Sequence, residues 1–215
     1  MATGEQLLAR VKSKIDEPDY TDEDFFGLLN EGLSTVTEML VFPGLQATAS
    51  VNTATNASVV ALPANYQKGL YAASFTDGTR PTILSSLAQL IELAGNYYEE
   101  VGDINCICEH GANLAYDRIP AAAVAIKLHY YRKAAEITDA TTVLDGITPA
   151  VLARVEKAIV HYAAHVAIDD RDNGVAKTDT NHHLDLFNSI VDEIRRTTSV
   201  GVSRPAAPVV KGCFR

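Results

Sequence analysis

The chain has 215 residues, of which 47% are hydrophobic and 21% are charged, and its formal net charge is −9. This composition is typical of a globular protein, and the acidic balance does not fit a protein that grips the phosphates of nucleic acid. No apolar run approaches the roughly 20 residues that cross a bilayer, and the start lacks the apolar core of a secretory signal, so we expect an intracellular product without a membrane span.

Two amphipathic helices are predicted at the start of the chain. In the first, Thr3 and Gln6 fit a capping box ahead of apolar residues at helical spacing. The second begins after Thr21, and three carboxylates occupy its first turn, where the helix dipole favours anions. Its apolar period continues until Pro43-Gly44.

A β-rich segment follows these helices. Residues 46–62 are rich in Thr, Val, Ser and Ala and predict a hairpin with its turn at residues 52–56. Residues 70–76 predict a strand, and Asp77-Gly78 predicts a tight hairpin turn into residues 81–83.

A short helix, capped by Ser85 or Ser86, is predicted next. Two strands, 104–109 and 114–119, are then predicted on either side of His110-Gly111.

The last predicted strand alternates most clearly of all. The residues on its apolar face are Val124, Ile126, Leu128 and Tyr130. Those on its other face are Lys127, His129 and Tyr131. This pattern predicts a half-buried antiparallel strand, with one face in a core and one toward water or a partner.

Two more helices are predicted after this strand. Thr148-Pro149 begins the first, which extends to Asn173-Gly174. Asp179 or Thr180 is expected to cap the second. From Ser199 onward the periodicity ends, and the last residues contain two prolines, three cations and no carboxylate.

This order of elements predicts an α+β fold, in which a small antiparallel β unit is inserted into a helical bundle. The expected parts are a helix pair at 1–45, the β unit with one short helix at 46–138, a second helix pair at 139–198, and an extended arm at 199–215.

Several residues are candidates for a chemical site. His161, His165 and Asp169 are spaced by four on one predicted helix, where they would hold a metal ion or lie as polar residues of a packed helix. Cys106 and Cys108 share a strand face but lack a second pair, which favours small half-buried residues. No glycine-rich phosphate loop and no G-x-S-x-G occur, so no catalytic residue and no cofactor is predicted.

Tyrosine pairs and the arm are the candidate interface. Tyrosine buries a large area at low entropy cost and keeps a polar tip, and a cationic, partly apolar arm on an acidic body suits a segment that orders on a neighbour. A sheet-rim tyrosine and a frayed terminus are the alternatives. The candidate interface residues are Tyr97, Tyr98, Tyr130, Tyr131, Arg132, Lys133, Arg204, Val209, Val210, Lys211, Phe214 and Arg215.

Three stretches of the sequence resemble the head–tail adaptor proteins of tailed bacteriophages. They are YTDEDFFGLLNEGLSTV, VVALPANYQKGLYAASFTDGTRP and NLAYDRIPAAAVAIKLHYYRKAAEIT. The matching segments are Thr21 to Gly32, Ala61 to Tyr66, Thr76 to Thr82 and Leu114 to Lys133. The chain departs from the family pattern at Gly32, where Ala is frequent, and in its long C-terminal tail.

The resemblance implies a structural protein without catalytic residues. Members of the family form a ring, typically of twelve copies, beneath the portal protein, and present a platform to tail or nozzle proteins while DNA passes through the centre. The expected location is the head–tail junction of the virion, after assembly in the host cytoplasm. The alternatives are a tail-side completion or stopper protein, and a metal-dependent hydrolase built on His161, His165 and Asp169.

Overall fold

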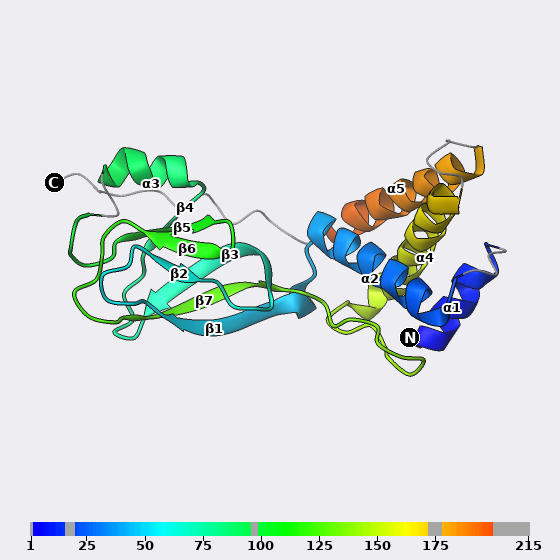
Figure 1. Cartoon of the computed structure of the whole chain (residues 1–215), viewed down its shortest axis with the longest axis horizontal. Coiled ribbons are helices and arrows are strands. Elements are labelled where there is room, and N and C mark those ends of the chain that lie inside the picture. Colours follow the sequence, from blue (N-terminus) through cyan, green and yellow to red (C-terminus); the bar gives the residue numbers. More distant parts are fainter. Residues whose placement is uncertain (1, 16–19, 96–98, 172–177, 200–215) are drawn as a thin grey trace. The chain divides into compact units, whose positions relative to one another are not determined.

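The computed structural model describes residues 2–15, 20–95, 99–171 and 178–199. The chain forms two compact units, Met1–Leu40 with Ala135–Arg215, and Val41–Ala134. The first is a helical bundle, and the second contains two small β-sheets and one short helix, so the predicted α+β class is confirmed (Figure 1). Within the described ranges, no helix has the length and apolar character needed to span a membrane.

The helices α1 (Gly4–Lys12) and α2 (Asp22–Met39) begin where the sequence predicts. The Thr3 hydroxyl accepts the Gln6 N–H, and the Gln6 side chain accepts the Thr3 N–H. Thr21 and Asp24 form the same reciprocal pair at the start of α2. Both predicted caps are confirmed.

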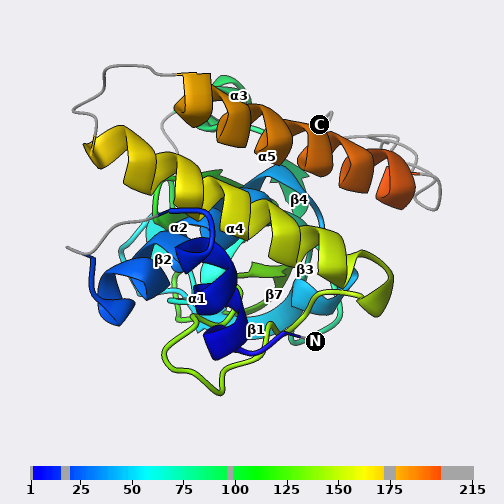
Figure 2. The same cartoon turned by 90° about the vertical axis from the view of Figure 1, so that its right-hand side faces the viewer.

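The helices α4 (Pro149–Arg171) and α5 (Thr178–Ser199) complete the bundle and run side by side in opposite directions (Figure 2). Asp179 and Thr180 lie inside α5, so the prediction that one of them caps it is wrong. Asp is also favoured in the first turn of a helix, where the sequence signal for a cap is ambiguous by one or two residues. Asn173-Gly174, the predicted end of α4, lies outside the described residues.

Apolar side chains from all four helices fill the bundle core. They include Leu7, Val11, Phe25, Leu29, Leu33, Val36, Val155, Ala158, Ile159, Phe187, Val191 and Ile194. Gly32 lets α2 approach α4 closely, because a Cβ there would lie 3.2 Å from the Ile159 carbonyl oxygen and from the Tyr162 side chain. The departure from Ala at this position therefore has a packing reason.

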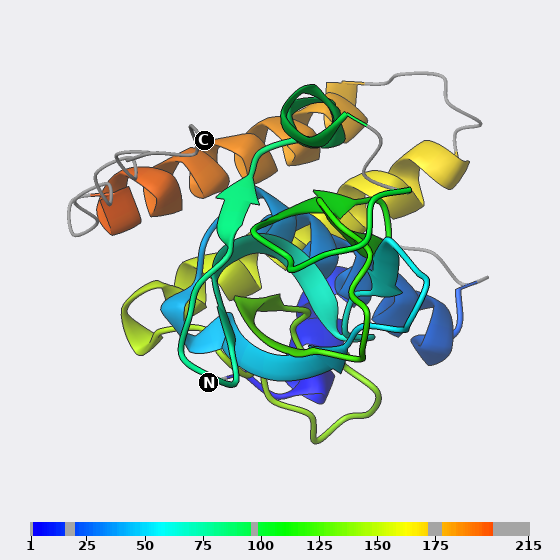
Figure 3. The same ribbon diagram turned by 90° about the vertical axis from the view of Figure 1, so that its left-hand side faces the viewer.

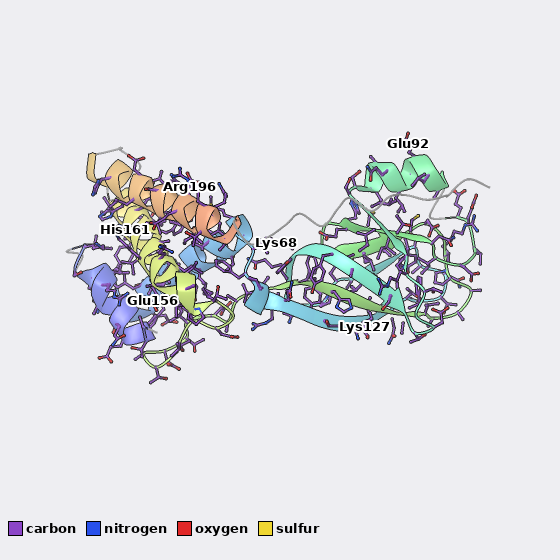
Figure 4. The ribbon with its side chains drawn as sticks, turned by 180° about the vertical axis from the view of Figure 1, so that it is seen from behind. Lys68, Glu92, Lys127, Glu156, His161 and Arg196 are labelled. Atoms are coloured by element: carbon purple, nitrogen blue, oxygen red, sulfur yellow. The ribbon has the colours of Figure 1, made fainter. Side chains whose placement is uncertain are left out.

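Two polar contacts join distant parts of the chain within this unit. The Glu156 carboxylate is buried, and it accepts the Ala2 N–H at 2.7 Å and the Arg10 guanidinium at 3.2 Å (Figure 4). The Asn30 side chain donates to the Ile137 carbonyl at 3.1 Å and accepts the Ile137 N–H at 2.7 Å. In each case a side chain forms hydrogen bonds with backbone groups of a residue that is distant in the sequence, so these backbone groups are not left without a partner.

The β unit contains two sheets, with strand orders β1-β7-β3 and β2-β6-β5-β4 (Figure 3). The strands are β1 (Gln46–Asn52), β2 (Val59–Ala61), β3 (Tyr66–Phe75), β4 (Thr82–Leu84), β5 (Cys106–His110), β6 (Asn113–Tyr116) and β7 (Ala125–Arg132). A 3₁₀ turn (Pro43–Leu45) precedes β1, and the helix α3 (Leu87–Ala94), capped by Ser86, packs on the four-stranded sheet. All strand pairs are antiparallel except β4 with β5.

Two of the predicted hairpins are wrong in their pairing. The strands β1 and β2 pair with β7 and β6 in different sheets, and β3 pairs with β7 whereas β4 pairs with β5. The Asp77-Gly78 turn does form, with Gly78 at φ +87°. Turn residues fix where the chain reverses, but the apolar face of β7 decides where β1 and β3 pair. The third hairpin, β5 with β6 around Gly111, is confirmed.

The core of the β unit lies between the apolar faces of the two sheets. Ile126, Leu128 and Tyr130 of β7 are buried there, as the alternation predicts. The Tyr130 hydroxyl donates to the Asn65 side-chain oxygen at 2.6 Å. This bond allows a tyrosine to occupy the core at low cost, because its polar atom is satisfied.

We predict that Glu156→Ala lowers the free energy of unfolding of the helical unit by about 2 kcal/mol or more, because the Ala2 N–H would lose its buried acceptor. The loss should be smaller for Glu156→Gln, which keeps an oxygen at that place. Urea unfolding followed by circular dichroism measures both. The control is Glu193→Ala, which removes a partner of Arg154 in an exposed ion pair and should cost less than about 1 kcal/mol. Equal losses in Glu156→Ala and the control would contradict the prediction.

Candidate interaction surface

The sheet β1-β7-β3 has one face in the core and one that faces away from it. Residues paired across neighbouring strands share a face, so the register fixes the composition of the second face. Its three rows are Ser50–Lys127–Ser74, Thr48–His129–Ala72 and Gln46–Tyr131–Lys68. We call these nine residues, together with Tyr71, the outer sheet face. All of them are exposed or half-buried.

A bulge in β3 brings Tyr71 onto the outer sheet face. The register of β3 against β7 shifts between Lys68 and Ala72, where Gly69 adopts φ +67°. This left-handed conformation favours glycine, and a Cβ on Gly69 would lie 3.2 Å from the Tyr131 ring. Glycine therefore allows the strand to bend close to Tyr131.

Tyr71, His129 and Tyr131 form an aromatic cluster on this face. The ring centroids of Tyr71 and Tyr131 are 5.4 Å apart, and those of Tyr71 and His129 are 6.1 Å apart. Partial burial and the neighbouring Tyr131 raise the pKa of Tyr71 above its ordinary value. The ordinary value of about 10 already lies above physiological pH, so the neutral phenol can donate a hydrogen bond. Rings with polar tips of this kind are enriched at protein interfaces.

The strand β1 holds two of these rings by hydrogen bonds. The Thr48 hydroxyl lies 3.1 Å from His129 Nδ1, and the Gln46 side-chain amide donates to the Tyr131 hydroxyl at 3.4 Å. The rings are thereby tied to the sheet, and less side-chain entropy remains to be lost when a partner binds.

The outer sheet face differs in charge from the chain as a whole. The strands β1, β3 and β7 contain no Asp or Glu, and the face carries Lys68 and Lys127 (Figure 4). Residues 41–134 have 6 Lys and Arg against 7 Asp and Glu, a net charge of −1. Residues 1–40 and 135–198 together have 9 against 20, a net charge of −11. The chain thus combines a strongly acidic helical unit with a nearly neutral β unit that has a local basic and aromatic face.

The structure separates the candidate interface residues of β7. Tyr131 belongs to the outer sheet face, whereas Tyr130 is only 1% exposed, because strand alternation turns it into the core. Arg132 is half-buried and donates to the Lys133 carbonyl at 3.3 Å, and Lys133 is exposed. The candidates that lie outside the described residues are Tyr97, Tyr98, Arg204, Val209, Val210, Lys211, Phe214 and Arg215. Sequence reasoning missed Tyr71, because the bulge interrupts the alternation of β3.

His161, the first of the candidate metal ligands, contacts a histidine of another helix. His161 is buried, and its Nδ1 lies 3.0 Å from Nδ1 of His183 on α5, which is the contact of a hydrogen-bonded imidazole pair. His165 and Asp169 are half-buried on the same helix as His161. Among the residues that the structure describes, no group of three or more His, Cys, Asp or Glu side chains is placed to hold a metal ion.

Cys106 and Cys108 are buried free thiols beneath α3, packed with Leu90 and Ala115. Burial, and secondarily the charge of Glu109, raises the pKa of the Cys108 thiol. A buried, protonated thiol behaves as a small apolar side chain.

A family model described as SU10 adaptor protein matches residues 2–209 and therefore spans both units. The chain belongs to the SU10 adaptor protein family. This is a family of phage head–tail adaptors, so the resemblance noted in the sequence is confirmed. No curated protein matches the sequence. As a member of this family of phage structural proteins, the chain has its place in the virion.

We predict that acid weakens the helical unit of this adaptor through His161. Burial is the main cause that lowers the pKa of His161 to about 4. The nearby charges of Lys14, His183, Lys157 and His182 contribute to this lowering. The unfolded chain, with an ordinary histidine pKa of about 6.5, takes up the proton first. The stabilisation by neutral His161 is therefore complete above about pH 6.5 and is lost as the pH falls toward 4.

Urea unfolding at pH 7.5 and at pH 4.5 measures this effect. The wild type should lose more stability between the two pH values than His161→Gln does. His110→Gln, which changes an exposed histidine at the end of β5, should keep the wild-type dependence. An unchanged pH dependence in His161→Gln would show that another group is responsible.

Proposed function

We propose that this chain is the subunit of a ring of twelve copies that lies beneath the portal protein, joins the capsid to the tail or nozzle proteins and lines the channel through which DNA passes. The observation that carries the proposal is the family match over residues 2–209, which includes both the helical bundle and the inserted β unit. An adaptor acts by shape and contact, so the proposal needs no catalytic group.

A ring subunit needs two lateral surfaces that fit each other but not themselves, since such heterologous contacts close by rotation. The chain offers two units that differ in secondary structure and in charge, −11 for the helical residues and −1 for the β unit. Two such unlike surfaces support a side-by-side arrangement of identical copies.

The charge also supports a role around a DNA channel. An acidic wall repels phosphates, so DNA would slide past it, whereas a basic wall would hold the DNA. The net charge of −12 for residues 1–198 suits passage without sequence-specific binding.

The portal contact is assigned to the C-terminal arm. Residues 199–215 carry Arg204, Lys211 and Arg215 and no carboxylate, together with apolar residues that include Val209, Val210 and Phe214. Lys133 and the half-buried Arg132 at the end of β7 add exposed positive charge to the β unit. Cations and apolar anchors together suit docking onto a neighbouring protein.

We predict that deletion of residues 199–215 leaves a folded subunit that no longer joins its portal protein in a pull-down. The full-length variant with Arg204→Gln, Lys211→Gln and Arg215→Gln serves as the matched control, because it keeps the length and the apolar anchors. It should bind more weakly than the wild type and lose the salt dependence of binding. Circular dichroism checks that both variants fold. Undiminished portal binding by the deletion variant would exclude the arm as the clamp.

A further inference from the structure

The outer sheet face has the character of a docking surface. It combines two lysines, a cluster of two tyrosines and a histidine, and a row of hydroxyl and amide groups from β1, and none of its residues is acidic. Tyr71 is 46% exposed, and Ser50 and Lys127 of the same face are also exposed. An exposed aromatic cluster with cations on its margins suits an acidic partner with few bulky side chains.

Such a partner surface occurs on α2 of the same chain. This helix contains five carboxylates and neither Lys nor Arg. Glu23, Glu31 and Glu38 are all exposed, and their spacings of eight and seven residues bring them to the same side of the helix. The opposite side of α2 is buried in the bundle through Phe25, Leu29, Leu33 and Val36.

The side of α2 that carries Glu23, Glu31 and Glu38, which we call the outer side of α2, also has small residues between these glutamates. Exposed Gly27 and Ser34 lie between the three glutamates, and a Cβ on Gly27 would meet no atom within 4 Å. The Ser34 hydroxyl donates to the Glu38 carboxylate, and the Glu31 carboxylate accepts the Tyr162 hydroxyl at 2.7 Å, so these bonds hold both carboxylates in place. Small residues between carboxylates would let a sheet approach the helix closely.

We propose that the outer sheet face of one copy docks on the outer side of α2 in a second copy, with Lys68 and Lys127 facing Glu23, Glu31 and Glu38. This inference rests on the proposed function, since it names the lateral contact of the ring. The surfaces are opposite in charge and unlike in shape, so the contact is heterologous and repeats around a ring rather than closing as a symmetric dimer. The overall acidity of the chain favours this partner over nucleic acid.

The size of the face sets the strength of the contact. Three strands spaced by about 4.8 Å, each about seven residues long, cover roughly 300 Å² in plan. A stable pairwise interface buries about 800 Å² on each partner. Two free copies should therefore associate weakly through this contact, and its electrostatic part should weaken further in salt.

Disulfide trapping tests the contact directly, because it captures weak association. Ser50→Cys places a thiol on the outer sheet face and Ser34→Cys places one on the outer side of α2, each in a full-length Cys213→Ser chain. Cys106 and Cys108 are buried and remain. Under mild oxidation the mixture of the two variants should form a disulfide-linked dimer several times faster than either variant alone, and 0.5 M salt should slow it several-fold.

Charge exchange then tests the pairing. Lys68→Glu with Lys127→Glu in the Ser50→Cys chain should slow trapping at least several-fold, and adding Glu23→Lys with Glu38→Lys to the Ser34→Cys chain should restore it. Arg80→Glu, in the turn between β3 and β4, is the control for a charge change off the sheet and should have little effect. Equal trapping of Ser50→Cys with itself, or no rescue by the exchanged charges, would overturn the inference.

Portal pull-down and binding to a 30-base-pair DNA duplex, run in parallel, separate the possible failures. Portal binding without the Ser50–Ser34 cross-link would refute this contact and leave the adaptor function standing. The cross-link without portal binding would refute the adaptor function and leave the contact standing. DNA binding that is lost in Lys68→Glu with Lys127→Glu, with no cross-link, would overturn the inference in favour of a nucleic-acid surface.

Discussion

The β unit depends on the central position of β7, which is hydrogen-bonded to β1 on one side and to β3 on the other. Successive side chains of this strand point to opposite faces of the sheet, so the strand contributes to both the core and the outer sheet face. Ile126, Leu128 and Tyr130 bury their side chains between the sheets, while Lys127, His129 and Tyr131 form the middle column of the outer sheet face. A slip of one residue in the register would exchange the two sets and destroy the core and the face together. The need for an apolar core therefore also fixes the geometry of the proposed contact.

The helical unit depends on segments from both ends of the described chain. Asn30 binds the backbone of Ile137 in both directions, and Glu156 binds Ala2 and Arg10. Gly32 allows α2 and α4 to pack closely. These contacts hold one side of α2 in the bundle and leave the glutamates of its other side exposed. The same packing therefore completes the helical bundle and exposes the acidic side of α2.

The sequence predicts some levels of this structure better than others. Helices were predictable because Thr3, Thr21 and Ser86 cap them locally and the apolar period continues within each. The strands were predictable from alternation, yet the pairing of β1 and β3 was not, since both partners lie on β7, more than fifty residues away. Tyr71 was missed because Gly69 inserts a bulge, and the His161–His183 contact was missed because it joins two helices whose relative rotation the sequence does not specify. Local chemistry predicts elements, whereas long-range packing decides their neighbours.

The family and the charge distribution lead to one account, in which an acidic helical unit and a β unit with a basic, aromatic face tile around a channel. Cryo-electron microscopy of the full-length chain mixed with its portal protein tests that account most directly. The account predicts a new ring of density beneath the portal, with the β unit of each copy beside the helical unit of the next. A portal without added density under conditions in which the chain is folded and in excess would contradict it.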